Sequence, residues 1–273
     1  MKAQNVKDLM EKHVKAFHGI KKPVIGCLHL RPLPGTPFWD PSYSFKQHTD
    51  DLKEEAAILT ELGYDAVTFA NEGDIPYMTK AGPEIIASYT AIVSEVARFL
   101  TVPYGVGLQL DSYATFAVAA AVNAVFVRGI FCYTAVSDHG LINADPGAIW
   151  RYAKSIGAVD MPAYTVIEPH AGFILDQRDV TEKYLSAATN MPVTGYAMAS
   201  SGKPGKDSVI ARCKALNPHI PVIINSGANP DNIKAQLEYA DGVIVGTYLK
   251  KDHFLFNSID RDNARRFIEA AKG

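Results

Sequence analysis

Two short glycine-containing segments in the last quarter of the sequence have the residue types that hold a phosphate group. Ser226 and Gly227 end one apolar run, and Gly246 and Thr247 end another. Because glycine has no Cβ, backbone N–H groups beside it can approach an anion closely. Two tight turns would leave the same pattern. We favour the phosphate site and predict that these four residues bind a phosphorylated small molecule.

Other apolar runs end in side chains that could do acid–base chemistry. Carboxyl groups and imidazoles could move a proton at a carbon next to a carbonyl, and an arginine could stabilise the negative charge that develops. A purely structural role competes for two of them, since Glu72 and Asp74 could form a hydrogen-bonded turn. The predicted catalytic residues are Glu72, Asp74, Arg128, Asp138 and His170.

Some of the same polar residues could instead bind a divalent metal ion that polarises an oxygen atom. The candidates are His29, Glu72, Glu168 and His170. No short HxxxH-type spacing supports such a site, so we assign no metal ligands. The cofactor stays unknown, with a divalent metal as one option.

The positions of the lysines argue against one type of catalysis. Schiff-base chemistry needs a desolvated lysine on a strand, and no lysine lies in any predicted strand. Lys203 lies in a Ser/Gly-rich segment, and Lys250 and Lys251 follow the last apolar run. Nucleoside triphosphate hydrolysis ranks last, because no G-x-x-x-x-G-K-[ST] motif is present.

The elements that must position these residues alternate regularly. Nearly continuous apolar runs, typical of strands buried on both faces, alternate with amphipathic stretches. We predict strands at 24–30, 66–70, 102–108, 124–130, 163–167, 193–196, 222–225 and 242–245, and helices at 46–62, 84–99, 112–122, 147–156, 179–189, 206–216, 230–239 and 261–271. A further helix at 5–17 would close the bottom of the fold or contact a partner subunit.

This alternation defines an α/β protein and favours a (β/α)8 barrel, the TIM-barrel fold. A doubly wound open sheet is the alternative, but it usually carries a glycine-rich loop after the first strand, where this chain has Pro32 and Pro34. In a (β/α)8 barrel the loops after strands seven and eight commonly bind phosphate. Those are the two glycine segments described first.

Length and composition fit one barrel domain over residues 1–273, with residues 1–20 as an N-terminal helical extension. Of 273 residues, 48% are apolar and 21% charged, and the net charge is −2. No basic run is interleaved with aromatic residues, so we expect no nucleic-acid partner. No segment resembles a signal peptide or an integral membrane span. Three isolated cysteines favour a cytoplasmic location, and we expect a homo-oligomer.

Taken together, these residues resemble the BtpA family of (β/α)8 barrels, and in particular its SgcQ-like branch. The resemblance covers about Pro23 to Lys272. It is carried by the opening CLHLRPLPG at 27–35, Asn71-Glu72 with Ile75-Pro76-Tyr77 following, Phe126-Val127-Arg128 with Ser137-Asp138 downstream, and the ending GTYLKKD at 246–252.

The resemblance implies a barrel of the ribulose-phosphate-binding type. Family members have been linked to photosystem I biogenesis, and the SgcQ branch to sugar-phosphate uptake and catabolism. We therefore weigh two functions. The first is an isomerase, epimerase or lyase of sugar-phosphate metabolism. The alternative is a non-enzymatic assembly factor that uses the barrel as a binding platform.

Overall fold

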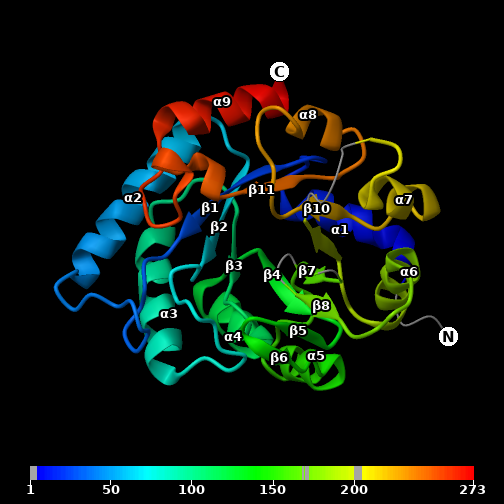
Figure 1. Ribbon diagram of the computed structural model, residues 1–273, viewed down its shortest axis with the longest axis horizontal. Helices are drawn as coiled ribbons and strands as arrows, with labels where there is room; N and C mark the ends of the chain where they lie inside the picture. Colours follow the sequence, from blue (N-terminus) through cyan, green and yellow to red (C-terminus); the bar gives the residue numbers. More distant parts are fainter. Residues whose placement is uncertain (1–4, 168, 170–171, 200–204) are drawn as a thin grey trace.

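A closed parallel β-barrel forms the centre of the molecule (Figure 1). The computed structural model describes residues 5–167, 169, 172–199 and 205–273. In that part of the chain, eight strands close in the order β1-β11-β10-β9-β7-β4-β3-β2. They are β1 Val24–His29, β2 Ala66–Ala70, β3 Tyr104–Gly107, β4 Phe126–Phe131, β7 Ala163–Val166, β9 Gly195–Met198, β10 Val222–Ile224 and β11 Val243–Val245.

Strand pairing closes the barrel between the first and the last of these strands. Val24 to Gly26 pair with Val243 to Val245, while Ile25 to His29 pair with Ala66 to Ala70 on the other side. All pairs in the barrel are parallel, so every carboxyl end lies at the same mouth. The predicted (β/α)8 barrel is confirmed.

Helices surround the barrel, and several begin at a residue whose side chain accepts hydrogen bonds from the first backbone N–H groups of the helix. Ser44 and Gln47 form a reciprocal capping box at the first of them, and Asp111 accepts hydrogen bonds from two backbone N–H groups at another. The helices are α2 Phe45–Glu61, α3 Pro83–Ala97, α4 Ser112–Val122, α5 Pro146–Ser155, α6 Val180–Asn190, α7 Val209–Leu216, α8 Ile233–Gln236 and α9 Arg261–Lys272. Only α8 is much shorter than predicted. Short 3₁₀ turns, η2 Thr247–Leu249 and η3 Lys251–His253, follow β11.

The N-terminal helix closes the amino end of the barrel, which was one of the two roles predicted for it. It consists of a 3₁₀ turn, η1 Val6–Asp8, and α1 Leu9–Ala16. Phe17, directly after α1, is fully buried, with its ring 5.2 Å from that of Phe126. His13 is buried beside it, and its Nδ1 lies 2.6 Å from the Tyr164 hydroxyl.

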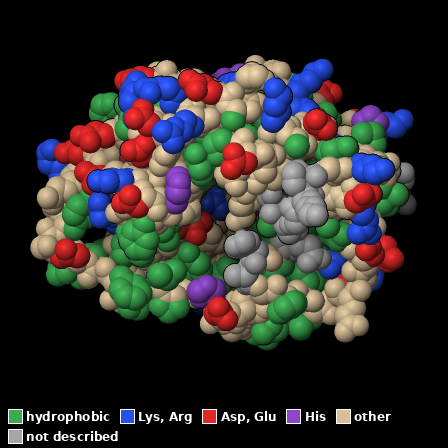
Figure 2. Space-filling model, turned by 45° about the horizontal axis from the view of Figure 1, so that its top comes forward, with side chains coloured by type: hydrophobic (Ala, Val, Ile, Leu, Met, Phe, Trp, Pro, Cys, Tyr) green, Lys and Arg blue, Asp and Glu red, His purple; other side chains and the backbone are tan. Residues whose placement is uncertain are grey.

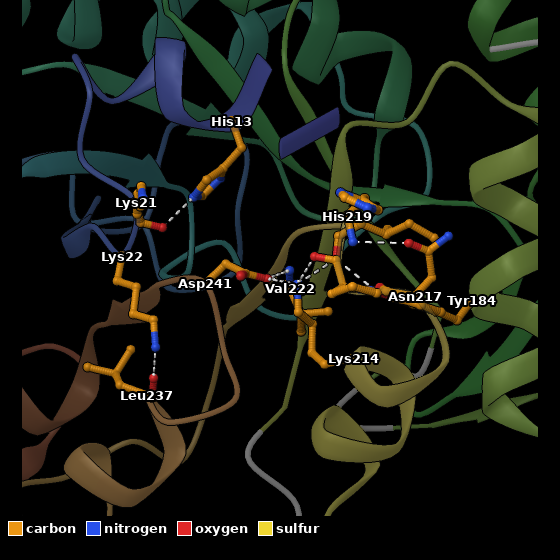
Figure 3. Close-up of polar contacts among 12 residues, drawn as sticks. His13, Lys21, Lys22, Tyr184, Lys214, Asn217, His219, Val222, Leu237 and Asp241 are labelled. Carbon is orange, nitrogen blue, oxygen red and sulfur yellow. Dashed lines mark hydrogen bonds and ion pairs between the residues drawn. The ribbon is translucent and has the colours of Figure 1, made fainter. Parts of the chain in front are cut away.

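Polar contacts tie the amino ends of neighbouring strands together at this bottom face (Figure 3). The Asp241 carboxylate accepts hydrogen bonds from the Val222 N–H at 2.8 Å and from Lys214 Nζ at 2.6 Å. His13 Nε2 contacts the Lys21 carbonyl, and Lys22 donates to the Leu237 carbonyl. Apolar packing and hydrogen bonds therefore fix the amino end of the barrel. None of these contacts involves the carboxyl ends of the strands, where the mouth opens.

A small antiparallel sheet beside the mouth was not predicted. It contains β5 Ala135–Ser137, β6 Gly140–Ile142 and β8 Phe173–Ile174, in the order β6-β5-β8. Among the residues described, no helix is both long enough and apolar enough to cross a membrane.

Candidate functional site

A cavity of about 640 Å³ opens at the carboxyl ends of the barrel strands. Figure 2 shows it as a hollow near the centre of the face drawn, with basic and acidic side chains inside it. It is lined by residues of β1 and β4, by residues that follow β2, β3, β10 and β11, and by the β5–β6 turn. This is the end of the barrel where active sites are built in proteins of this fold.

All four predicted phosphate residues line one wall of this cavity: Ser226, Gly227, Gly246 and Thr247. The two glycines are needed for different reasons. Gly227 has φ +73°, which favours a residue without a Cβ. A Cβ on Gly246 would lie 2.6 Å from the His29 ring, so the imidazole occupies the space that a side chain would take.

Four backbone donors on this wall have no hydrogen-bond acceptor among the described residues. The N–H groups of Gly227, Ala228, Thr247 and Tyr248 find no acceptor within the described part of the chain. No lysine or arginine among the described residues lines the same wall. An anion bound here would be held by main-chain and hydroxyl donors rather than by a cation.

Glu72 and Arg128 face this wall from the other side of the ring of strands. Arg128 Nη2 lies 3.3 Å from Glu72 Oε1, and their side chains are 5% and 20% exposed. Gln109 Nε2 donates to Oε1 at 2.7 Å, and the Tyr77 hydroxyl donates to Oε2 at 2.8 Å. Burial raises the pKa of the Glu72 carboxyl, but Arg128 and these hydrogen bonds outweigh it and hold the pKa below its ordinary value. Glu72 is therefore a fixed, ionised carboxylate.

The Arg128 guanidinium keeps hydrogen-bonding capacity. Its Nη2 also contacts Cys27 Sγ at 3.5 Å, and its buried Nε has no hydrogen-bond partner among the described residues. Burial raises the pKa of the Cys27 thiol to about 11, so at neutral pH this is a protonated thiol and not a nucleophile. Arg128 is thus a fixed cation with donors left for a ligand.

His29 stands between the two walls, at the end of β1. Burial lowers the pKa of its imidazole to about 3, which makes the ring neutral at physiological pH. Its buried Nδ1 has no hydrogen-bond partner in the described part of the chain. The sequence suggested His29 only as a metal ligand or as one of several polar residues. Because His29 is the last residue of the first strand, its position in the sequence could have identified it as a candidate acid–base residue.

The other predicted catalytic residues do not join Glu72 and Arg128. Asp74 lies outside the cavity lining and accepts hydrogen bonds from the Leu33 N–H at 2.8 Å and Asn71 Nδ2 at 2.9 Å. These contacts fix a loop, which is the structural alternative named for it above. Asp138 is exposed in the turn between β5 and β6 and does not line the cavity, whereas its neighbours Ser137 and His139 do.

Two of the predicted polar residues, Glu168 and His170, lie outside the described residues. Within the described ranges, no group of three or more His, Cys, Asp or Glu side chains could hold a metal ion.

Comparison with known proteins places this site in a family. The sequence model of the BtpA family matches residues 20–273. The chain belongs to the BtpA family. Three BtpA-family relatives illustrate its range: the sgc region protein SgcQ of Escherichia coli (31% identical, covering 94% of this chain and 96% of that protein), an uncharacterized protein of Archaeoglobus fulgidus (33%; 93% and 100%) and the photosystem I biogenesis protein BtpA of Synechocystis sp. (28%; 91% and 87%).

Solved structures agree on the architecture. The chain resembles a phosphoribosylanthranilate isomerase of Thermotoga maritima with a TM-score of 0.55 at 14% identity, covering 92% of this chain and 99% of that one. It resembles a structure described as native KDPGal with a TM-score of 0.54 at 18% identity, covering 92% and 94%. At this identity the likeness shows the fold alone, which is a TIM barrel.

Proposed function

We propose that this BtpA-family barrel binds a phosphorylated small metabolite at its mouth and acts on it as an isomerase, epimerase or lyase. One observation carries the proposal: the glycine segments after β10 and β11 and the Glu72–Arg128 pair line the same cavity from opposite sides. A metabolite held by its phosphate on one wall would present its carbon skeleton to the other.

The contacts of each side chain suggest its role. Ser226, Gly227, Gly246 and Thr247 would hold the phosphate. Arg128, with its unused donors, would stabilise negative charge on an oxygen of the substrate. Glu72 would accept a hydrogen bond from a substrate hydroxyl or take the proton, and the neutral His29 would exchange a proton at the neighbouring oxygen. His170 stays a predicted base.

Inorganic phosphate tests the binding half of the proposal. We expect Gly227→Ala to weaken phosphate binding, measured by calorimetry, by about tenfold or more, because the added Cβ strains a left-handed backbone. Gly157→Ala is the matched control, since Gly157 has φ +77° in an exposed turn far from the mouth. It should cost similar stability and leave phosphate binding unchanged. Equal phosphate affinity in both variants would contradict the proposed site.

The catalytic half has its own readout. Incubating the protein in D₂O with phosphorylated aldoses and ketoses should give deuterium exchange at a carbon next to the carbonyl. We expect Arg128→Gln to slow that exchange by about 100-fold, because the guanidinium would stabilise the negative charge that develops on the substrate. Phosphate affinity should be retained, because Arg128 is not part of the wall that holds the phosphate.

A non-enzymatic role is the alternative, suggested by the name of the Synechocystis relative, a photosystem I biogenesis protein. It predicts a stable complex with a partner protein and no deuterium exchange with any phosphorylated metabolite. The homo-oligomer and the cytoplasmic location expected from the sequence also stay predictions, and sedimentation of the purified protein would test the first of them.

A further inference from the structure

A second cavity, of about 570 Å³, lies between the segment that follows β1 and the helices α2 and α3, and it shares no lining residue with the mouth. It is built by segment 31–45 after β1, by α3 and by Phe256. In Figure 1, segment 31–45 lies on the left, beside α2 and α3. Hydrophobic side chains gather on the same side of the face drawn in Figure 2. Pro32, Leu33 and Pro34 of the opening motif, which the proposed function does not use, form part of its wall.

Aromatic side chains surround the opening of this cavity, and buried side chains form its base. Leu33, His48 and Ile92 line it and are buried. Phe38, Trp39 and Phe45 surround it with 61%, 42% and 49% of their surface exposed. Clustered exposed apolar side chains mark contact sites, and a concave site of this volume with a buried floor is typical for small ligands rather than for a flat protein contact.

Two fixed donors point to the kind of group that such a ligand carries. The Arg31 guanidinium lies over the Tyr43 ring, 4.7 Å from its centre, and 3.6 Å from the Asp51 carboxylate. That carboxylate also accepts a hydrogen bond from the Tyr43 hydroxyl. Within the described residues, the Tyr43 side chain and a long ion pair with Asp51 hold Arg31 at the cavity, and guanidinium N–H groups are left for an acceptor.

His48 supplies the second donor. Its Nε2 accepts a hydrogen bond from the Arg31 backbone N–H at 3.0 Å, so the proton of the neutral ring is on Nδ1. Burial, with Arg31 nearby, lowers the pKa of His48 to about 4 and keeps the ring neutral. The one carboxylate of the lining, Asp40, already accepts two hydrogen bonds from Ser42.

We propose that this cavity is a second ligand site, which binds a small planar aromatic compound with a carboxylate group. The ring would stack among Phe38, Trp39 and Phe45, and the carboxylate would accept hydrogen bonds from Arg31 and His48. Aromatic stacking and a charge-assisted bond to arginine are the two interactions that this lining supplies.

The second site would also communicate with the mouth. A narrow cavity of about 20 Å³ lies between them; it shares His29 and Leu255 with the mouth and Arg31, His48 and Phe256 with the second cavity. Segment 29–31 is thus a wall of both. Binding at one site should shift the affinity of the other, and by the same factor in both directions.

Tryptophan fluorescence provides a direct test, because the sequence has two tryptophans and Trp150 is buried in the core. In the Trp150→Phe variant, all tryptophan emission comes from Trp39. Benzoate should change that emission saturably at millimolar concentration, whereas benzamide, a neutral analogue, and cyclohexanecarboxylate, a non-aromatic anion, should act at concentrations about tenfold higher.

Arg31→Gln, made in the Trp150→Phe background, should weaken benzoate binding by about tenfold and leave the benzamide response unchanged. Arg265→Gln is the matched control, because Arg265 is a half-exposed arginine paired with Asp262 on α9 and lies outside the cavity lining. An equal benzoate response in both arginine variants, or no saturable change, would overturn the proposal. So would a Trp39 emission that changes with protein concentration alone, which would indicate a second copy of the chain in the groove.

The communication between the sites has a separate readout. Benzoate should change the affinity for inorganic phosphate in the wild-type protein, and the same change in Arg31→Gln should need about tenfold more benzoate. This step rests on the proposed phosphate site. If phosphate does not bind at all, the fluorescence test of the second site still stands, and if phosphate binds without responding to benzoate, only the communication is refuted.

Discussion

At the scale of single residues, the polar side chains near the mouth have one of two roles. Some face the cavity and could bind a ligand, and others hold the surrounding loops in place. Asp74 belongs to the second group. Its carboxyl is buried and accepts two hydrogen bonds, yet burial still raises its pKa to about 6 from an ordinary value of 3.8. Between about pH 4 and pH 6, the folded protein keeps this proton while the unfolded chain releases it.

Stability should therefore fall as the pH rises through that window, by up to about 3 kcal/mol from this group. We expect Asp74→Asn to remove the dependence, because an amide does not titrate. Its overall stability should be lower, since the amide group cannot accept from both partners. Urea unfolding of both proteins at a series of pH values measures this, and parallel stability curves would show that Asp74 does not titrate as described.

Residue positions in the site were only partly predictable from the sequence. The rule that strand ends face the mouth found Glu72, Arg128 and the four residues of the phosphate wall. It also selected Asp74 and Asp138, because a sequence does not reveal which way a side chain points once the strand has ended. Asp74 turns toward Leu33 and Asn71, and Asp138 lies in a hairpin turn.

At the scale of elements, hydrophobic runs long enough to cross the barrel were easy to predict. All eight strands and the surrounding helices occur where they were expected, with ends that differ by a few residues. The β5–β6–β8 sheet was missed because its strands have two or three residues each, too few to show a pattern. α8 is short because Asn229 and Asn232 form a hydrogen-bonded turn before it.

The connection from β11 to α9 carries half of the phosphate wall and is fixed to α2 by a buried ion pair. Lys250 Nζ lies 2.9 Å from both carboxylate oxygens of Glu55, which also accepts a hydrogen bond from the Ile259 N–H. Lys250→Met would leave a buried carboxylate without its cation, so we expect a loss of about 3–5 kcal/mol in the free energy of unfolding.

The double variant Glu55→Gln/Lys250→Met should recover part of that loss, because glutamine is neutral and can still accept from Ile259. Urea denaturation of the single and double variants gives the coupling between the two residues. Additive losses would mean that the pair does not fix this connection.

At the scale of the whole molecule, the two ends of the barrel do different work. The mouth carries unpaired donors, a neutral imidazole and a charged pair, all of which cost stability when buried without a ligand. Apolar packing at the bottom offsets this cost: α1 covers the amino end, and a second apolar cluster, which includes Phe17, Phe126 and Tyr164, fills the barrel interior from that end up to the floor of the mouth. This division lets the mouth be adapted to a ligand without weakening the fold.

Phe17→Ala tests this division, because the side chain is fully buried and lies at the far end of the barrel from the phosphate wall. Removing the ring should lower the free energy of unfolding by about 3–5 kcal/mol through lost burial and the cavity left behind. Phosphate affinity, measured below the unfolding transition, should stay as in the wild type. Gly227→Ala should show the opposite balance, with a small loss of stability and a large loss of phosphate affinity. If Phe17→Ala weakened phosphate binding as strongly as Gly227→Ala does, the two ends of the barrel would be coupled, and their roles could not be separated in this way.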